Sequence, residues 1–316
     1  NRSSPQVKDA MLGIKNIYVD HNEVDSYLAF AQKSGFETDV SAVERDSLSF
    51  AAADRVYQNR DYARALNLMD SYLQKYPQGV YRADALFALG DCSLHEGNRA
   101  GALAAFEEVG AMPSNRYQVM ALQKAASMRM EDKEYAAAAD LYKRMSTTAL
   151  QKRTVLEALN GYLEAIVATN DLAAAGVAAD EVLESPYAAD DLARKAHFVK
   201  GRSLQAAGDE AGALTHYREV TDARTRDAAE SYYHIISILY KQGKLKEAEQ
   251  EVFAFSEQNL PYQYWMGKAF LVLGDVYVKQ GDAFQAKATY QSIVDGYTDK
   301  TDGVVDEALK KIESLK

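Results

Sequence analysis

Residues 97–106 read GNRAGALAAF, and the same frame returns at nearly fixed intervals along the chain. A turn former opens the frame, Ala102 follows five residues later, and Phe106 stands four residues beyond it. Residues 208–217 (GDEAGALTHY) and 281–290 (GDAFQAKATY) repeat the pattern. Self-similarity at a period of 20–50 residues predicts a solenoid of stacked structural units. Seven alanines, 35 to 38 residues apart, hold the central position: Ala65, Ala102, Ala138, Ala175, Ala213, Ala248 and Ala286.

The composition favours an all-α chain. Only 5 of the 316 residues are proline and 18 are glycine, whereas residues with high helix propensity abound. The hydrophobic fraction of 47% is enough for a large core. No run of about 18 apolar residues occurs, so we expect no membrane-spanning helix.

Charge and cysteine content exclude several classes of function. The formal net charge of −10 disfavours binding to nucleic acid, which requires clustered Lys and Arg to neutralise phosphates. The single cysteine, Cys92, rules out an intrachain disulfide and a multi-cysteine metal site. Because Cys92 lies in an apolar helical segment, we expect a buried and unreactive thiol.

Each unit is predicted to be a pair of antiparallel helices that cross at small side chains. Two helices approach closely only where their side chains are small, and larger residues fill the flanking space. We place the seven repeats at starts near Asp46, Ala83, Val119, Leu156, Arg194, Ala229 and Gly267. The eighth residues are Ala53, Gly90, Ala126, Leu163, Gly201, Ile236 and Gly274. The twenty-fourth residues are Met69, Phe106, Tyr142, Ala179, Tyr217, Val252 and Tyr290.

Turn formers and prolines mark the boundaries. A left-handed cap should end the first helix at Gly97, Asn170, Gly208, Gly243 and Gly281. Prolines at 77, 113, 186 and 261 should separate successive repeats. Residues 1–45 form a degenerate N-terminal repeat in this scheme, with Gly13 in its first helix and Asp25 at the alanine position. Residues 46–297 hold seven repeats. Residues 302–316 form a capping helix with Val305, Leu309 and Ile312 on its apolar face.

This pattern resembles the tetratricopeptide repeat (TPR) between Asp46 and Tyr297, with seven small residues in register with seven turns. The mean spacing near 37 exceeds the 34 residues of the family. The resemblance implies a right-handed α-solenoid of seven to eight helical hairpins that binds a protein or peptide in a concave groove. It does not extend to the family's clamp for acidic chaperone tails, because no repeat has Lys at position five.

In the family, positions 2, 5, 9, 12 and 13 commonly face the groove. Two repeats place an aromatic residue one turn before a carboxylate there. This arrangement suits a partner segment that carries Lys or Arg. The alternative is that the aromatic rings pack between neighbouring first helices, and the sequence leaves both open. The candidate groove residues are Phe50, Asp54, Tyr57, Phe87, Asp91, Phe198, Arg202 and Tyr233.

Catalytic and metal-binding motifs do not occur in the sequence. There is no phosphate-binding loop, nucleophile elbow or zinc-protease motif. The five histidines never fall three or four residues apart, so we expect isolated structural or surface histidines. The aromatic stretch 262–265, which contains Trp265, is interpreted as a staple between two repeats or as a contact on the rim. We therefore expect a non-enzymatic protein without cofactor or metal.

The stretched, proline-separated repeats resemble bacterial TPR proteins of the Gram-negative cell envelope, including relatives of the outer-membrane assembly lipoprotein and the Tol–Pal coordinating protein. That resemblance implies a periplasmic or outer-membrane-associated scaffold, with the cytoplasm as the alternative. The first residue is Asn1 rather than methionine, so we expect a processed chain or a piece of a longer one. Two other functions stay open: a peptide-sensing regulatory module and a structural spacer.

Overall fold

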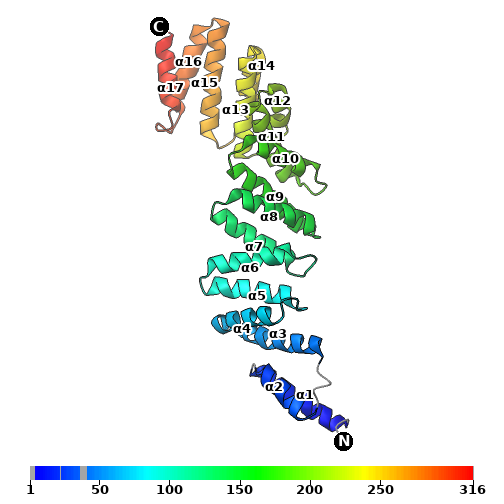
Figure 1. Ribbon diagram of the computed structural model, residues 1–316. Helices are drawn as coiled ribbons and strands as arrows, with labels where there is room; N and C mark the ends of the chain where they lie inside the picture. Colours follow the sequence, from blue (N-terminus) through cyan, green and yellow to red (C-terminus); the bar gives the residue numbers. More distant parts are fainter. Residues whose placement is uncertain (1–3, 22, 36–40, 316) are drawn as a thin grey trace. The chain divides into compact units, whose positions relative to one another are not determined.

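The structure, a computed structural model, describes residues 4–21, 23–35 and 41–315, and these form seventeen α-helices without a strand (Figure 1). The chain divides into two compact units, Asn1–Ala158 and Leu159–Lys316. The helices are α1 (Pro5–Asp20), α2 (Val24–Lys33), α3 (Ala42–Gln58), α4 (Tyr62–Lys75), α5 (Arg82–His95), α6 (Arg99–Ala111), α7 (Gln118–Glu131), α8 (Tyr135–Thr148), α9 (Lys152–Ala168), α10 (Leu172–Glu184), α11 (Asp190–Ala206), α12 (Glu210–Arg218), α13 (Arg226–Lys241), α14 (Leu245–Glu257), α15 (Gln263–Gln280), α16 (Ala283–Gly296) and α17 (Val304–Ser314).

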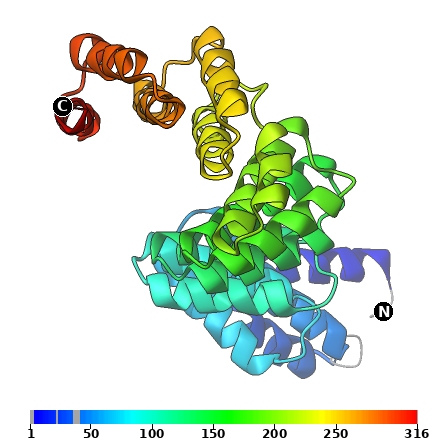
Figure 2. The same cartoon turned by 90° about the horizontal axis from the view of Figure 1, so that it is seen from above.

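In the first unit, consecutive helices pack in pairs. Helix α3 contacts α4, α5 contacts α6, and α7 contacts α8, while α4 and α6 also contact the first helix of the following pair (Figure 2). Helices α4 and α6 are therefore each held between two first helices. The preceding pair, α1 and α2, packs on α3 through a small cluster that includes Val19, Tyr27 and Leu48.

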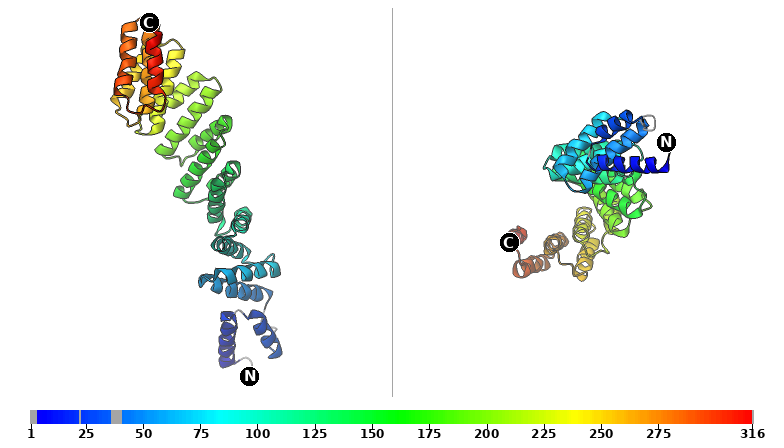
Figure 3. Two further views of the ribbon diagram at one scale, coloured as in Figure 1. Left: turned by 90° about the vertical axis from the view of Figure 1, so that its left-hand side faces the viewer. Right: turned by 90° about the horizontal axis from the view of Figure 1, so that it is seen from below.

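The second unit repeats this arrangement from α10 to α17. Helices α12, α14 and α16 each contact both their own first helix and the next helix along the chain. The last three helices, α15, α16 and α17, lie side by side (Figure 3). Because α17 covers the last pair, the apolar face of that pair is not left open to water. The all-α solenoid predicted from the repeats is confirmed.

The central alanines occupy the buried helix crossings. All seven are at most 2% exposed, as the frame requires. Glycine at position eight serves the same crossing. A Cβ atom on Gly90 would lie 2.7 Å from the Phe106 ring, and one on Gly201 would lie 2.7 Å from the Tyr217 ring. Gly274 faces Tyr290 in the same way. An aromatic ring at position twenty-four is therefore accommodated where position eight has no side chain.

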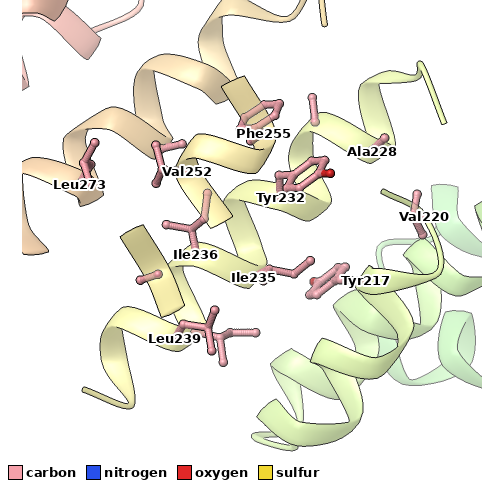
Figure 4. Packing of buried hydrophobic residues seen from close by; sticks show 14 of the residues in the cluster. Tyr217, Val220, Ala228, Tyr232, Ile235, Ile236, Leu239, Val252, Phe255 and Leu273 are labelled. Carbon is pink, nitrogen blue, oxygen red and sulfur yellow. The ribbon is translucent and has the colours of Figure 1, made fainter. Parts of the chain in front are cut away.

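In other repeats, the side-chain volumes at positions eight and twenty-four compensate for each other. Ile236 and Val252 share one buried cluster, where Tyr232 also stacks on Phe255 with ring centroids 4.9 Å apart (Figure 4). In the fourth repeat, Leu163 and Ala179 are both fully buried. A large residue at one position is thus accompanied by a smaller one at the other, which keeps the filled volume similar.

The turn inside each predicted repeat contains one residue with positive φ. Glycine takes this conformation at 97, 208, 243 and 281, and Asn170 has φ of 61°, all as predicted. Arg60 and Lys133 hold the same place with φ of 62° and 61°. Since a Cβ atom makes this region unfavourable, these two turns are strained, and neither Arg nor Lys is a residue type that predicts a left-handed turn.

At the ends of the chain, the N-terminal pair departs from the repeat frame, and the prediction for the capping helix was wrong at one residue. Asp25 is exposed and its Oδ1 lies 2.6 Å from Nζ of Lys75, while Ala31 is the buried small residue of α2. Gly13 has nothing within 4 Å of a Cβ position, so it is no helix crossing. In α17, Leu309 is 44% exposed. The buried face of α17 is shifted by one residue and consists of Val304, Val305 and Ala308, with Ile312 packed beside them.

Gly201→Ala tests the size rule at the crossing. The new methyl group would meet the buried Tyr217 ring, so we expect a loss of about 1–3 kcal/mol in the free energy of unfolding. Gly13→Ala is the matched control, because open space surrounds it and alanine favours a helix. Urea denaturation measures both. A Gly201→Ala protein as stable as the wild type would contradict the rule.

Lys133→Gly tests the strain in the third turn. Removing the Cβ atom at φ 61° should raise the free energy of unfolding by about 1 kcal/mol. Gly208→Lys is the reciprocal variant and should lower the free energy of unfolding by a similar amount. No neighbouring atom would clash with a Cβ atom at Gly208, so the positive φ is the only source of strain. Thermal and urea unfolding of both variants provide the comparison. Equal shifts in the same direction would show that the turn geometry is not the cause.

Candidate protein-binding surface

The candidate surface is formed by the first helices of the pairs, and we call it the first-helix face of each unit. In the first unit it includes α3 and α5, which contact each other directly. In the second unit α13 contacts both α11 and α15, and α15 contacts α17. Each predicted groove residue lies on one of these helices.

The two phenylalanines of the first unit are buried. Phe50 stacks on Tyr81 with ring centroids 4.6 Å apart, and Phe87 stacks on Tyr117 at 4.4 Å. Both phenylalanines are at most 8% exposed. Tyr81 and Tyr117 each precede the first residue of the next first helix. These rings therefore join successive repeats, which favours the packing interpretation that the sequence left open.

The corresponding aromatic contact of the second unit is more accessible. Tyr233 of α13 lies 5.5 Å from Trp265 of α15 between ring centroids. Both are only partly buried, and Tyr264, which meets Trp265 edge-on, is 41% exposed. We call Tyr233, Tyr264 and Trp265 the aromatic cluster. The stretch that contains Trp265 thus acts as a staple between repeats and also presents aromatic surface.

The acidic residues of the first unit already have partners within the chain. The Tyr57 hydroxyl donates to Oδ2 of Asp91 at 3.0 Å, and Nζ of Lys124 lies 3.3 Å from Oδ1 of the same carboxylate. Burial and the Asp91 charge raise the pKa of Tyr57. Asp54 accepts a hydrogen bond from Gln58 at 3.3 Å. Asp91 therefore connects three first helices instead of presenting a free charge.

The second unit repeats this arrangement. Nζ of Lys195 lies 2.5 Å from Glu164, and Nζ of Lys311 lies 2.7 Å from Asp275. The Tyr290 hydroxyl also donates to Asp275 at 2.6 Å. In each case the lysine belongs to the helix that follows along the face. Carboxylates on first helices thus join neighbouring helices together, and this reduces the negative charge that a partner would meet.

Phe198 and Arg202 complete the predicted set. Phe198 is 7% exposed and belongs to the main buried cluster of the second unit. The Arg202 guanidinium is exposed and lies 5.9 Å from the Phe198 ring centroid. Among the described residues, no carboxylate forms an ion pair with Arg202, whereas Asp91, Glu164 and Asp275 at the same frame position each form one.

Two histidines predicted to be isolated are in contact. Nδ1 of His197 on α11 lies 2.9 Å from Nδ1 of His216 on α12. The prediction was wrong because these residues are 19 apart in sequence and meet only when the two helices fold together. Burial lowers the pKa of both imidazoles, and for His216 the neighbouring His197 and Lys200 lower it further.

Other chemistry is sparse in the described part of the chain. No group of three or more His, Cys, Asp or Glu side chains is arranged there to hold a metal ion. Cys92 is buried, and burial raises the pKa of its thiol to about 11, which disfavours the reactive thiolate. None of the helices in residues 4–21, 23–35 and 41–315 combines the length and apolarity needed to cross a bilayer.

Family models of the tetratricopeptide repeat match residues 50–115, 198–263 and 264–299, together just over half of the chain. The chain belongs to the tetratricopeptide-repeat family. The matched segments include the helix crossings at Ala65, Ala102, Ala213, Ala248 and Ala286, whereas those at Ala138 and Ala175 lie outside them. Members of this repeat family are protein–protein interaction scaffolds, and the fold is generally non-catalytic. No curated protein sequence matches the chain.

Among solved structures, one that carries a TPR sensor has a similar fold. A signal-transduction ATPase with numerous domains from Pyrococcus horikoshii, which carries a TPR sensor, has 10% identity and a TM-score of 0.51. The match covers 89% of this chain and 50% of that one. A TPR protein from Parabacteroides merdae has 16% identity and a TM-score of 0.35, with 85% of this chain and 98% of that chain covered. At 10% identity, the likeness to the ATPase concerns the fold alone.

The histidine pair predicts a loss of stability in acid. Both folded-state pKa values lie below the ordinary 6.5, so the unfolded chain binds more protons. The stabilisation is complete above about pH 6.5 and is lost as the pH falls through the lowered values. We expect the melting temperature to fall less between about pH 7.5 and about pH 5 in the His197→Asn, His216→Asn protein than in the wild type.

The exposed His21 supplies the control for this comparison, as His21→Asn should keep the wild-type pH dependence. Titration of the carboxylates changes the melting temperature equally in all three proteins. It therefore cancels when the melting temperatures of the variants are compared with that of the wild type. If the double variant loses as much stability in acid as the wild type, the contact between the two imidazoles does not cause the effect.

Proposed function

We propose that this TPR scaffold binds a partner protein on the first-helix face of its second unit, with the aromatic cluster as the anchor. The observation that carries the proposal is the partial exposure of Tyr233, Tyr264 and Trp265 on two successive first helices. Tyrosine and tryptophan provide a large apolar area together with a polar group, and they are enriched among the residues that dominate binding energy.

The packing around the cluster supports a preformed site. The Tyr233 and Trp265 rings contact each other, and the His234 ring lies 6.4 Å from that of Trp265. His234 in turn stacks on the fully buried Tyr217 at 4.9 Å. Rings held in this way lose little conformational freedom when a partner binds, which favours affinity.

The charges near the cluster suit a partner recognised mainly by shape and apolar contact. Lys268 of α15 lies 2.8 Å from Glu307 of α17, and Lys311 is paired with Asp275. Since these charges are matched within the chain, a strongly basic partner gains little here. The partner that fits best exposes apolar side chains, and the charges on this face do not require it to carry Lys or Arg.

Crosslinking in the native cells tests the surface. A photoreactive amino acid placed at Tyr264 should capture the partner, whereas one placed at the exposed Phe284 on α16 should not. Tyr233→Ala should reduce capture from position 264 about tenfold or more, in line with the loss of an aromatic anchor. Phe284→Ala is the matched control, because it removes an exposed ring from a second helix.

A structural spacer predicts a different outcome. If partners crosslink only from second-helix positions, or if Tyr233→Ala leaves capture unchanged in a folded protein, the first-helix face of the second unit is not the binding site. Circular dichroism of each variant verifies the fold. The cell-envelope location implied by the resemblance stays a prediction, and fractionation of the native cells followed by immunodetection tests it.

A further inference from the structure

A hollow of about 190 Å³ opens beside Arg202 in the second unit. Its wall is mostly aliphatic and comes from the end of α9, the start of α10 and the middle of α11. The polar lining consists of Arg202, Asn170 and Asp171. The apolar lining consists of Val167, Leu172, Ala175 and Val199.

The repeats of the chain supply a template for this place. In the frame, Val167 and Leu172 correspond to Tyr57 and Tyr62 of the first repeat, whose rings pack 6.3 Å apart. Arg202 corresponds to Asp91, which accepts the hydrogen bond of Tyr57. Two tyrosines and a carboxylate therefore fill the earlier site, whereas two aliphatic residues and a guanidinium surround the hollow.

Arg202 lacks the partner that its counterparts have. Asp91, Glu164 and Asp275, at the same frame position, each form an ion pair with a lysine. Among the described residues, Arg202 has neither an ion pair nor a hydrogen bond. Its guanidinium lies near the Phe198 ring, and its charge opposes the burial that raises the pKa of Asp227 without forming an ion pair with that carboxylate. A guanidinium presents five donors in a fixed plane, which matches the two oxygens of a carboxylate.

Asp171 does not neutralise this guanidinium. It is the N-cap of α10, and its Oδ1 accepts hydrogen bonds from the backbone N–H groups of Ala173 and Ala174, both at 3.0 Å. The positive end of the helix dipole offsets its charge there. The net charge of −10 acts weakly at the hollow, because salt screens charges beyond about 8–10 Å.

We propose that this hollow receives an aspartate or glutamate side chain of a protein partner, with the carboxylate on Arg202. The carbon stem and an adjacent aliphatic residue of the partner would cover Val167, Leu172 and Val199, as the rings of Tyr57 and Tyr62 cover the equivalent place. This inference rests on the proposed function of the chain as a protein-binding scaffold and adds the chemistry of one contact.

Two capped pentapeptides probe the hollow in the purified full chain. One reads alanine-leucine-glutamate-leucine-alanine, and the other has glutamine in place of glutamate. The readout is the NMR signal of the Arg202 side-chain Nε–H during titration. We expect the glutamate peptide to bind about tenfold more tightly than the glutamine peptide, as a charged hydrogen bond is lost in the latter. Equal binding of the two would overturn the proposal.

Variants separate the charge from the shape of the site. Arg202→Gln should remove the preference for glutamate, measured by the backbone signals of Val199, while Arg153→Gln, another exposed arginine, should keep it. Val167→Tyr should fill the hollow, as Tyr57 fills the equivalent place in the first repeat. It should weaken binding of the glutamate peptide about tenfold although Arg202 is unchanged. A preference for glutamate that survives Arg202→Gln would refute the assignment.

A third peptide, alanine-leucine-leucine with a free C-terminus, distinguishes the source of the carboxylate. If it binds more tightly than the glutamate peptide, the occupant is a chain end and the side-chain assignment is wrong. This assay is independent of the aromatic cluster. If a partner still crosslinks from position 264 but the peptides do not bind, the proposed function holds and the assignment of the hollow is wrong. If the peptides bind but no partner crosslinks, the assignment of the hollow holds and the proposed function is wrong.

Discussion

The helix crossing inside each repeat is the constraint on which the rest of the structure depends. The two helices of a repeat approach closely only if position twenty is alanine and the side chains at positions eight and twenty-four together fill a limited volume. Different residue pairs meet this condition: Gly90 with Phe106, Gly201 with Tyr217, and Ile236 with Val252. The close approach fixes the turn, and the turn requires positive φ even at Arg60 and Lys133. Local strain at two turns is thus maintained by packing elsewhere.

Contacts between repeats use a second set of interactions. Phe50 on Tyr81 and Phe87 on Tyr117 stack aromatic rings across the boundary, and carboxylates such as Asp91 accept hydrogen bonds or ion pairs from the neighbouring helices. Surface ion pairs contribute little individually, so the buried apolar clusters, to which the stacked rings belong, supply more of the cohesion. The aromatic rings and carboxylates that make these contacts are therefore not available to recognise a partner. What is left accessible on the first-helix face is therefore informative about binding.

The sequence predicted the fold well because the fold is periodic and local. The central alanines, the turns and the prolines each report a constraint that acts within about 40 residues. It predicted the candidate site less well. A phenylalanine one turn before a carboxylate looks the same whether its ring faces a groove or the next helix, and Phe50 and Phe87 face the next helix. His197 and His216 meet only through tertiary packing, and Leu309 shows that one residue decides which face of a helix is buried.

Departures from the repeat pattern are where function is expected in an array of similar units, since natural sequences break local rules chiefly at functional sites. Two departures coincide in the second unit. Tyr233 and Trp265 keep the aromatic contact between repeats but leave part of it accessible, and Arg202 replaces a carboxylate beside two shortened side chains. Neither change is needed for the helix crossings, because Ala175 and Ala213 remain fully packed there. Stability alone does not account for these residues, and the two proposed binding sites give each of them a role.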